Sequence, residues 1–219
     1  MRKLLLIAPI LCLAVACTTT PSGNSGVPGQ VLIPLASGNY WIYVDSTFND
    51  TTGAFETLYL DTVTLNGQTQ QYSSADGNVV FYGVSDSLGW FGTGGYLGVD
   101  PSNTVIYGAD SAGAQPYIFF ETANADGVDL GSSTDYTNAA CPVTYTLYGF
   151  VSTTKIGGFT SLQNTQVTTN CNGAITEQIN TYVDPGIGVT RIVDYETATG
   201  GTSPQLSFTQ TLQSYNITQ

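Results

Sequence analysis

The chain has 219 residues and carries 16 Asp or Glu against 4 Lys or Arg, which gives a formal net charge of −12 at pH 7. A surface this acidic repels phosphate backbones, so nucleic acid is excluded as a partner. The chain has no histidine, which removes the commonest general base and excludes catalysis by a Ser-His-Asp or Cys-His arrangement.

Residues 1–16 have the features of a secretory signal peptide, because Arg2 and Lys3 precede a short apolar stretch. That stretch is shorter than the roughly 20 residues that a membrane-spanning helix needs. Residues 13–17 (LAVAC) resemble the lipobox of bacterial lipoproteins. The resemblance implies that Cys17 is acylated, as with palmitate, and becomes the mature N-terminus. Ordinary signal cleavage with an unmodified Cys17 is the alternative.

Residues 17–30 are rich in Thr, Ser, Gly and Pro, a composition that is typical of a flexible tether. Acyl chains on Cys17 would hold the protein to a membrane without a spanning segment. Thr18 follows in place of the Asp that is linked with inner-membrane retention in bacterial lipoproteins. The expected location is therefore the outer membrane, in the cell envelope.

Residues 31–219 are predicted to form one all-β antiparallel domain, built as a curved sheet or as a two-sheet sandwich. No long stretch repeats apolar positions with a helical period, whereas period-2 alternation and Gly, Asn and Asp turns recur. Asn66-Gly67 predicts a two-residue hairpin turn. The predicted strands are 40–44, 58–65, 68–72, 79–84, 104–107, 117–120, 143–151, 159–168, 175–183, 189–195 and 206–215.

Residues 85–135 are rich in Gly, Asp, Ser and Ala and predict short strands with long loops. Trp90, Phe91 and Tyr96 stand out in this region, because exposed aromatic rings among neutral amides could stack on the sugar rings of a neutral glycan. The alternative is that these rings pack between strands as core.

Residues 124–129 resemble the opening of a calcium loop, with oxygen ligands on Asn124, Asp126 and Asp129 and a glycine for the turn. The closing glutamate of such loops is missing. An ordinary Asp-Gly turn is the alternative interpretation, and no other cofactor is expected.

Cys141 and Cys171 lie in an oxidising compartment if the signal peptide is correct. A hairpin that turns at Lys155–Gly158 places the two cysteines at nearly equal distances from the turn. Because they then face each other at its open end, we predict a disulfide between them. Two free thiols are the alternative.

Two blocks near the ends of the domain, 34–43 (PLASGNYWIY) and 184–192 (DPGIGVTRI), resemble those of a group of uncharacterised bacterial β-rich lipoproteins. In that group a "PL..G..W.Y" strand opens the domain and a "pGvGlv" turn and strand close it. The resemblance implies a curved antiparallel sheet or sandwich on a lipidated tether, and it implies no activity. The residues themselves favour a structural role for both blocks, with Trp41 in the core.

Five Asp-Ser or Asp-Thr pairs resemble an O-glycosylation sequon of exported bacterial proteins, although such pairs also start turns. The acceptor hydroxyls would be Ser46, Thr51, Thr62, Ser87 and Ser111.

These features favour a non-catalytic envelope lipoprotein with a structural or interaction role, whose partner is another envelope protein or a glycan. A binding module for a neutral glycan or a small apolar ligand is the alternative. No spacing among the four glutamates marks a catalytic pair, so a carboxylate-dependent hydrolase is not expected.

Overall fold

The computed structural model describes residues 31–49, 51–74, 77–86, 95–198 and 201–218, and the elements within them are twelve β-strands. The all-β prediction is confirmed, with a single curved sheet in place of a sandwich. The strands are β1 (Tyr40–Phe48), β2 (Phe55–Ser74), β3 (Gly77–Asp86), β4 (Tyr96–Val99), β5 (Val105–Ala109), β6 (Tyr117–Glu121), β7 (Val128–Asp135), β8 (Val143–Ile156), β9 (Phe159–Thr169), β10 (Ile175–Asp184), β11 (Gly188–Glu196) and β12 (Gln205–Asn216).

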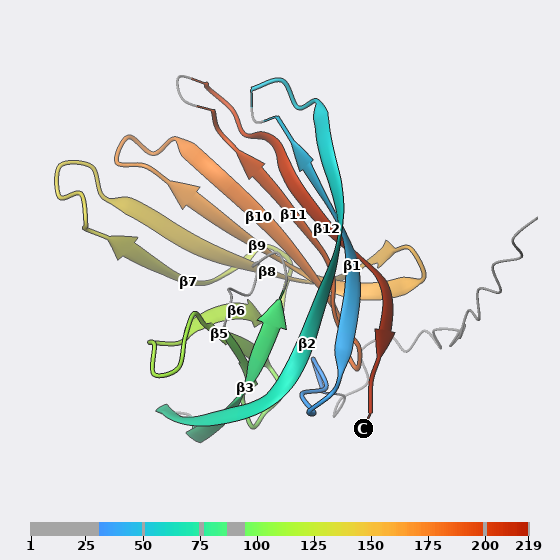
Figure 1. The fold of residues 1–219 in the computed structure, drawn as a ribbon. Helices are drawn as coiled ribbons and strands as arrows, with labels where there is room; N and C mark the ends of the chain where they lie inside the picture. The colour runs from blue at the N-terminus through green and yellow to red at the C-terminus, as the bar shows by residue number, and fades with distance from the viewer. Residues whose placement is uncertain (1–30, 50, 75–76, 87–94, 199–200, 219) are drawn as a thin grey trace, which may run out of the picture.

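All twelve strands form one sheet in the order β6-β5-β4-β3-β2-β1-β12-β11-β10-β9-β8-β7. The first and last strands pair at its centre, and β6 and β7 form its two edges. Only residues 122–127 join these edges, so the sheet has to curl until they lie close together (Figure 1). The side chain of Asn164 joins the β6 edge to β9, two strands inside the β7 edge, because its Nδ2 donates to the Glu121 carbonyl at 2.9 Å and its Oδ1 accepts from the Glu121 N–H at 2.7 Å.

The core fills the concave side of this curled sheet. Along β1 the inward side chains Trp41, Tyr43 and Asp45 are buried and their neighbours are half-buried, as expected for alternating residues of a strand. The main buried apolar cluster consists of Leu32, Ile33, Trp41, Tyr43, Val63, Leu65, Val84, Leu97, Ile106, Phe120, Val183, Val189, Ile192 and Leu212. A second, small cluster of Val79, Phe81 and Ala109 lies on the other face of β3 and β5.

The prediction of a hairpin turn at Asn66-Gly67 is wrong. Both residues lie within the 20-residue strand β2, at a bulge where the pairing with β3 shifts between Leu65 and Thr69. Gly67 has φ +81° and the Asn66 side chain accepts the Gln68 N–H at 3.0 Å. A left-handed glycine serves a bulge as well as a turn, so the dipeptide alone does not distinguish them.

Two strands were not expected from the sequence. β4 is only four residues long and contains Gly98, and β7 is polar and mostly exposed. Both lie in the region where short strands and loops were predicted. Their propensity is low, so pairing with neighbouring strands is what makes them extended.

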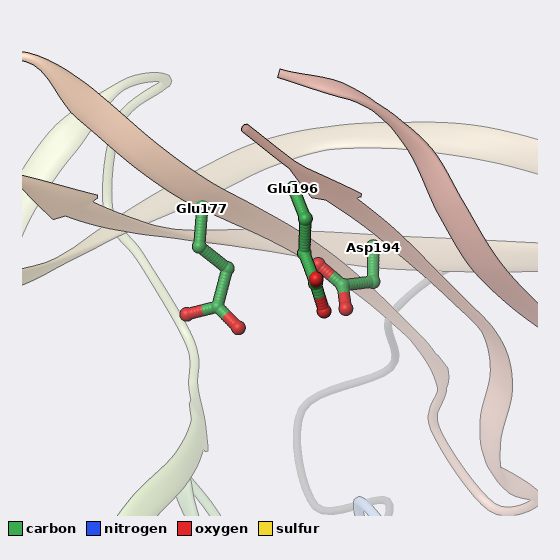
Figure 2. Close-up of side chains that lie close together, drawn as sticks. All are labelled: Glu177, Asp194 and Glu196. Carbon is green, nitrogen blue, oxygen red and sulfur yellow. The ribbon is translucent and has the colours of Figure 1, made fainter. Parts of the chain in front are cut away.

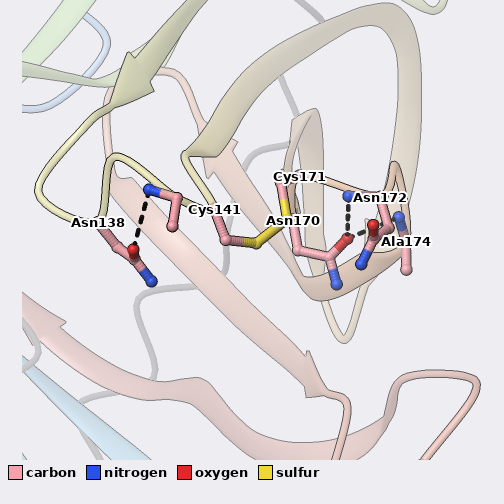
Figure 3. Close-up of a disulfide and its surroundings, with 7 residues drawn as sticks. Asn138, Cys141, Asn170, Cys171, Asn172 and Ala174 are labelled. Carbon is pink, nitrogen blue, oxygen red and sulfur yellow. Dashed lines mark hydrogen bonds between the residues drawn. A yellow bond between two sulfur atoms is a disulfide. The ribbon is translucent and has the colours of Figure 1, made fainter.

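The disulfide between Cys141 and Cys171 is present, as predicted, with their Cα atoms 4.8 Å apart. It joins the segments at the open end of the β8–β9 hairpin (Figure 3). Beside it the Asn170 side chain accepts the N–H groups of Asn172 and Ala174 at 3.0 and 3.1 Å. The turn that follows β9 is therefore held by both a covalent bond and hydrogen bonds.

Within the described segments, no helix has both the length and the hydropathy that crossing a membrane requires.

Candidate functional site

The two end blocks singled out in the sequence pack against each other, although they are about 146 residues apart. Trp41 Nε1 donates to the carbonyl of Ile187 at 2.7 Å, and the Tyr43 hydroxyl donates to the carbonyl of Val189 at 3.0 Å. Trp41 is 1% exposed. The prediction that Trp41 lies in the core is confirmed.

Gly188 allows the N-terminal segment to approach this turn. Its φ is +108°, and a Cβ at this position would lie 2.9 Å from Cγ1 of Ile33. The nearby Gly186 N–H donates to the carbonyl of Val31 at 2.6 Å. Residues 31–36 are thus fixed across one end of the curled sheet.

A pocket of about 690 Å³, here called the basal pocket, lies beside this N-terminal segment. Its described walls are mainly aliphatic, and none of the lining residues that the structure describes is charged. Val31 and Val80 are 41% and 38% exposed, although both belong to its wall. The lining residues are Val31, Ile33, Pro34, Leu35, Ala36, Asn78, Val80, Tyr82, Val99, Pro101, Gly186 and Thr218.

A second pocket of about 860 Å³, here called the edge pocket, lies where the two free edges of the sheet approach each other. Its wall combines Tyr117 of β6 and Tyr145 of β8 with neutral amides and hydroxyls. Asp110 is the one carboxylate among the lining residues that the structure describes. These are Asp110, Pro116, Tyr117, Ile118, Phe119, Leu130, Gly131, Ser132, Ser133, Tyr145, Thr146, Leu147, Asn164, Gln166, Ile179 and Thr181.

Acidic side chains gather on the concave face of the sheet, because strand register places each of them on the same face as core residues. They are Asp45, Asp61, Asp86, Glu177, Asp194 and Glu196. Arg191 lies on the opposite face of β11 from Asp194, three residues earlier in a regular stretch of the strand. Lys155 is exposed near the tip of the β8–β9 hairpin.

Two of these carboxyls, Asp45 and Asp61, contact the buried amide of Gln210, and the charge of Asp86 acts on Asp45. Asp45 is 1% exposed and Asp61 is fully buried, and Gln210 Nε2 donates to them at 3.4 and 3.5 Å. Burial, the nearby Asp61 and, more weakly, Asp86 raise the pKa of Asp45 to about 7, against the lowering effect of Gln210. Burial and the same carboxylates raise the pKa of Tyr43 well above its usual value.

The other three carboxyls, Glu177, Asp194 and Glu196, leave β10 and β11 on one side of the sheet (Figure 2). One oxygen of each lies within 4.8 Å of the other two. Thr168 Oγ1 donates to Glu177 at 2.9 Å. Sequence reasoning missed this group. Glu177 and Glu196 lie at nearly equal distances from the turn at Gly186, and the comparison that paired the cysteines would have found them.

The structure describes only one of the three aromatic residues that were predicted to contact a ligand. Trp90 and Phe91 lie outside the described residues. Tyr96 is half-buried on β4, packs against the small cluster of Val79, Phe81 and Ala109, and donates to Gln68 at 3.3 Å. It lines neither pocket.

The predicted calcium ligands Asn124, Asp126 and Asp129 are exposed and lie before and within the start of β7. Both Asp126 oxygens accept hydrogen bonds from Ser152, which lower the pKa of Asp126. Asp129 accepts the Gly131 N–H at 2.9 Å. These contacts are typical of the turn interpretation, and calcium binding there stays a prediction.

Among the predicted glycosylation sites, Thr51, Thr62 and Ser111 are exposed and Ser46 is half-buried. Ser87 and the predicted acylation site Cys17 lie outside the described residues. Modification at all of these positions stays a prediction.

No protein-family model matches this chain, and no curated protein matches it. Two crystal structures are similar to it over 85% of its length and 99% of their own. A candidate lipoprotein from Parabacteroides distasonis is 11% identical with a TM-score of 0.45. A candidate exported protein with a YmcC-like fold from Bacteroides fragilis is 12% identical with a TM-score of 0.40. The function is therefore inferred below from the chain's own residues.

Proposed function

We propose that this protein is a non-catalytic lipoprotein of the cell envelope, anchored to the outer membrane by an acylated Cys17, and that it binds a small apolar ligand in the basal pocket. The basic start, the short apolar stretch and the Ala16-Cys17 junction support the anchor. A clickable palmitate analogue tests it, and labelling that survives Cys17→Ala would contradict it.

The observation that carries the binding proposal is the exposure of aliphatic side chains on a concave wall. Val31 and Val80 are both more than one-third exposed while facing a pocket whose described lining contains no charged residue. Its volume of about 690 Å³ falls within the roughly 300–1,000 Å³ of small-molecule sites. Asn78, Tyr82 and Thr218 supply a few polar groups, so the ligand we expect is mainly hydrocarbon with a small neutral polar end.

A non-catalytic role is supported by the chemistry of both pockets. Hydrolysis by paired carboxyls requires two of them at the substrate, whereas the described lining of the two pockets contains Asp110 alone. The buried carboxyls Asp45 and Asp194 are 1% and 5% exposed, which leaves them out of reach of a substrate.

Binding of the neutral apolar dye N-phenyl-1-naphthylamine to the full chain carrying Cys17→Ala tests this function, because no acyl chain then competes. We expect saturable fluorescence that Val80→Gln weakens about ten-fold, since a polar amide replaces aliphatic wall. Val151→Gln is the matched control, because Val151 is a 49% exposed strand valine outside the pocket. Equal dye binding by both variants would exclude the basal pocket.

The edge pocket favours a second candidate function, the binding of a neutral glycan. Tyr117 is 42% exposed and stands beside amides and hydroxyls, a combination that suits stacking and hydrogen bonding with sugars. On a glycan array, binding of neutral oligosaccharides should be lost with Tyr117→Ala and kept with Tyr136→Ala, an exposed tyrosine outside the pocket. Binding that is the same in both variants, or no binding at all, would leave only the apolar ligand.

A further inference from the structure

Strand register forces three carboxylates together on the concave face. Glu177 of β10 lies directly opposite Glu196 of β11, and Asp194 lies two residues before Glu196 on the same face. Directly opposed like charges on neighbouring strands destabilise a sheet. Arg191, on the other face of β11, cannot offset this repulsion. The folded sheet therefore creates a concentrated negative charge that needs a proton or an external cation.

Asp194 gives a second, independent indication of a ligand. Its side chain is 5% exposed, and its Oδ1 atom is buried without a hydrogen-bond partner among the described residues. A carboxylate oxygen that is buried without a partner loses its hydrogen bonds to water on folding. This loss is unfavourable unless a proton or a cation binds the oxygen. Glu177 is half-buried and Glu196 is exposed. The group therefore has a buried floor and a side open to solvent, through which an ion can enter and keep some of its water.

We propose that Glu177, Asp194 and Glu196 bind one divalent cation of the calcium type. Their oxygens already lie within 4.8 Å of one another, so small side-chain adjustments bring three carboxylates around one ion. Calcium takes 6–8 oxygen ligands at about 2.3–2.6 Å, from carboxylates that bind through one or both oxygens and from water. The set contains no nitrogen or sulfur, so zinc and copper are less suited to it.

The proton is the competing ligand. Burial, then the charges of Glu177 and Glu196, raise the pKa of Asp194 to about 7. Calcium binding requires the ionised carboxylates and displaces any proton that they share. The calcium affinity should therefore rise as the pH increases from 6 to 8.

The test is a calorimetric titration of the purified full chain, freed of metal with a chelator, with calcium chloride at pH 8. We expect saturable binding at this group, and Glu196→Gln should weaken it about ten-fold or more, because it removes one charged ligand. Glu56→Gln is the matched control, since Glu56 is an exposed glutamate that accepts a hydrogen bond from Asn49 and lies on β2, which β1 and β12 separate from β11. Its affinity should equal that of the unmodified chain.

A thermal-unfolding series keeps the test independent of folding defects. Calcium should raise the Tm of the unmodified chain at pH 8, and Asp194→Asn should abolish this rise while itself unfolding at a higher temperature in calcium-free buffer. The proposal is overturned if the unmodified chain shows no saturable calcium binding at pH 8, which would leave a shared proton as the sole ligand. It is equally overturned if Glu196→Gln binds calcium as the unmodified chain does.

Discussion

Gly188 shows how much one residue can decide in this protein. Its left-handed backbone lets β11 begin directly after the turn, and its missing side chain leaves room for Ile33. Ile33 in turn belongs both to the core and to the wall of the basal pocket. A backbone requirement at one position thus connects the C-terminal turn with the proposed ligand site.

Gly188→Ala should destabilise the protein by about 3 kcal/mol, from an unfavourable φ and a clash with Ile33. The measurement is urea unfolding followed by circular dichroism. Gly157→Ala is the control, because Gly157 also has a positive φ of +59°, whereas a Cβ added there would meet no atom within 4 Å. The free energy of unfolding of Gly157→Ala should fall by only about 1 kcal/mol. Equal losses of unfolding free energy in the two variants would show that the close approach of Ile33 to Gly188 adds nothing to the destabilisation.

At the level of elements, the β8–β9 hairpin is the part that is specified most completely by local sequence. The pairing runs from Ile156 opposite Phe159 to Thr144 opposite Thr169 and leads directly to the disulfide. The edge strand β7 depends on this hairpin, since β8 is its only partner among the described strands. We therefore expect the disulfide to stabilise the edge of the sheet as well as the hairpin.

Replacing both cysteines, as Cys141→Ser with Cys171→Ser, should lower the free energy of unfolding by about 3 to 4 kcal/mol in the chain-entropy model. The Tm of the unmodified chain should fall in reductant toward that of the double variant, which reductant should not change further. A double variant with an unchanged Tm would mean that the bridge adds no stability.

At the scale of the whole molecule, the curled sheet separates two kinds of polarity. Carboxyls such as Asp45 and Asp194 face the concave side, whereas the opposite face of β9 and β10 carries neutral groups. There Thr165 donates to Asn180 at 2.7 Å, and Gln178 donates to the same oxygen at 3.3 Å. Since no lysine of the described segments lies among these carboxyls, the stability of the fold should depend on protons and cations.

The stability of the calcium-free protein should fall as the pH rises from about 4 to about 8. Burial with neighbouring carboxylates raises the pKa values of Asp45 and Asp194 to about 7, so both carboxyls bind protons more tightly in the folded protein than in the unfolded chain. The stability that these protons give is complete below the unfolded pKa and is lost as the pH rises through the folded one. The loss of stability per carboxyl should be at most about 4 kcal/mol.

Urea unfolding between pH 4 and 8 measures this dependence. Asp45→Asn should flatten the profile and stabilise the protein at pH 8, because a neutral amide replaces a buried charge. Asp110→Asn, an exposed control, should leave the slope unchanged. A stability that rises with pH in the unmodified chain would show that Asp45 and Asp194 are ionised without penalty.

The sequence by itself determined the β class, the positions of most strands, the disulfide and the place of Trp41 in the core. These follow from local alternation, turn residues and distance from a turn, which neighbouring residues specify. Only the tertiary structure decided that Asn66-Gly67 is a bulge, that the two pockets exist, and that Glu177 meets Asp194 and Glu196. Each of these depends on which strands pair and how far the sheet curls. That curl is set by the short β6–β7 connection and by packing across the whole concave core, which no local segment of the chain encodes.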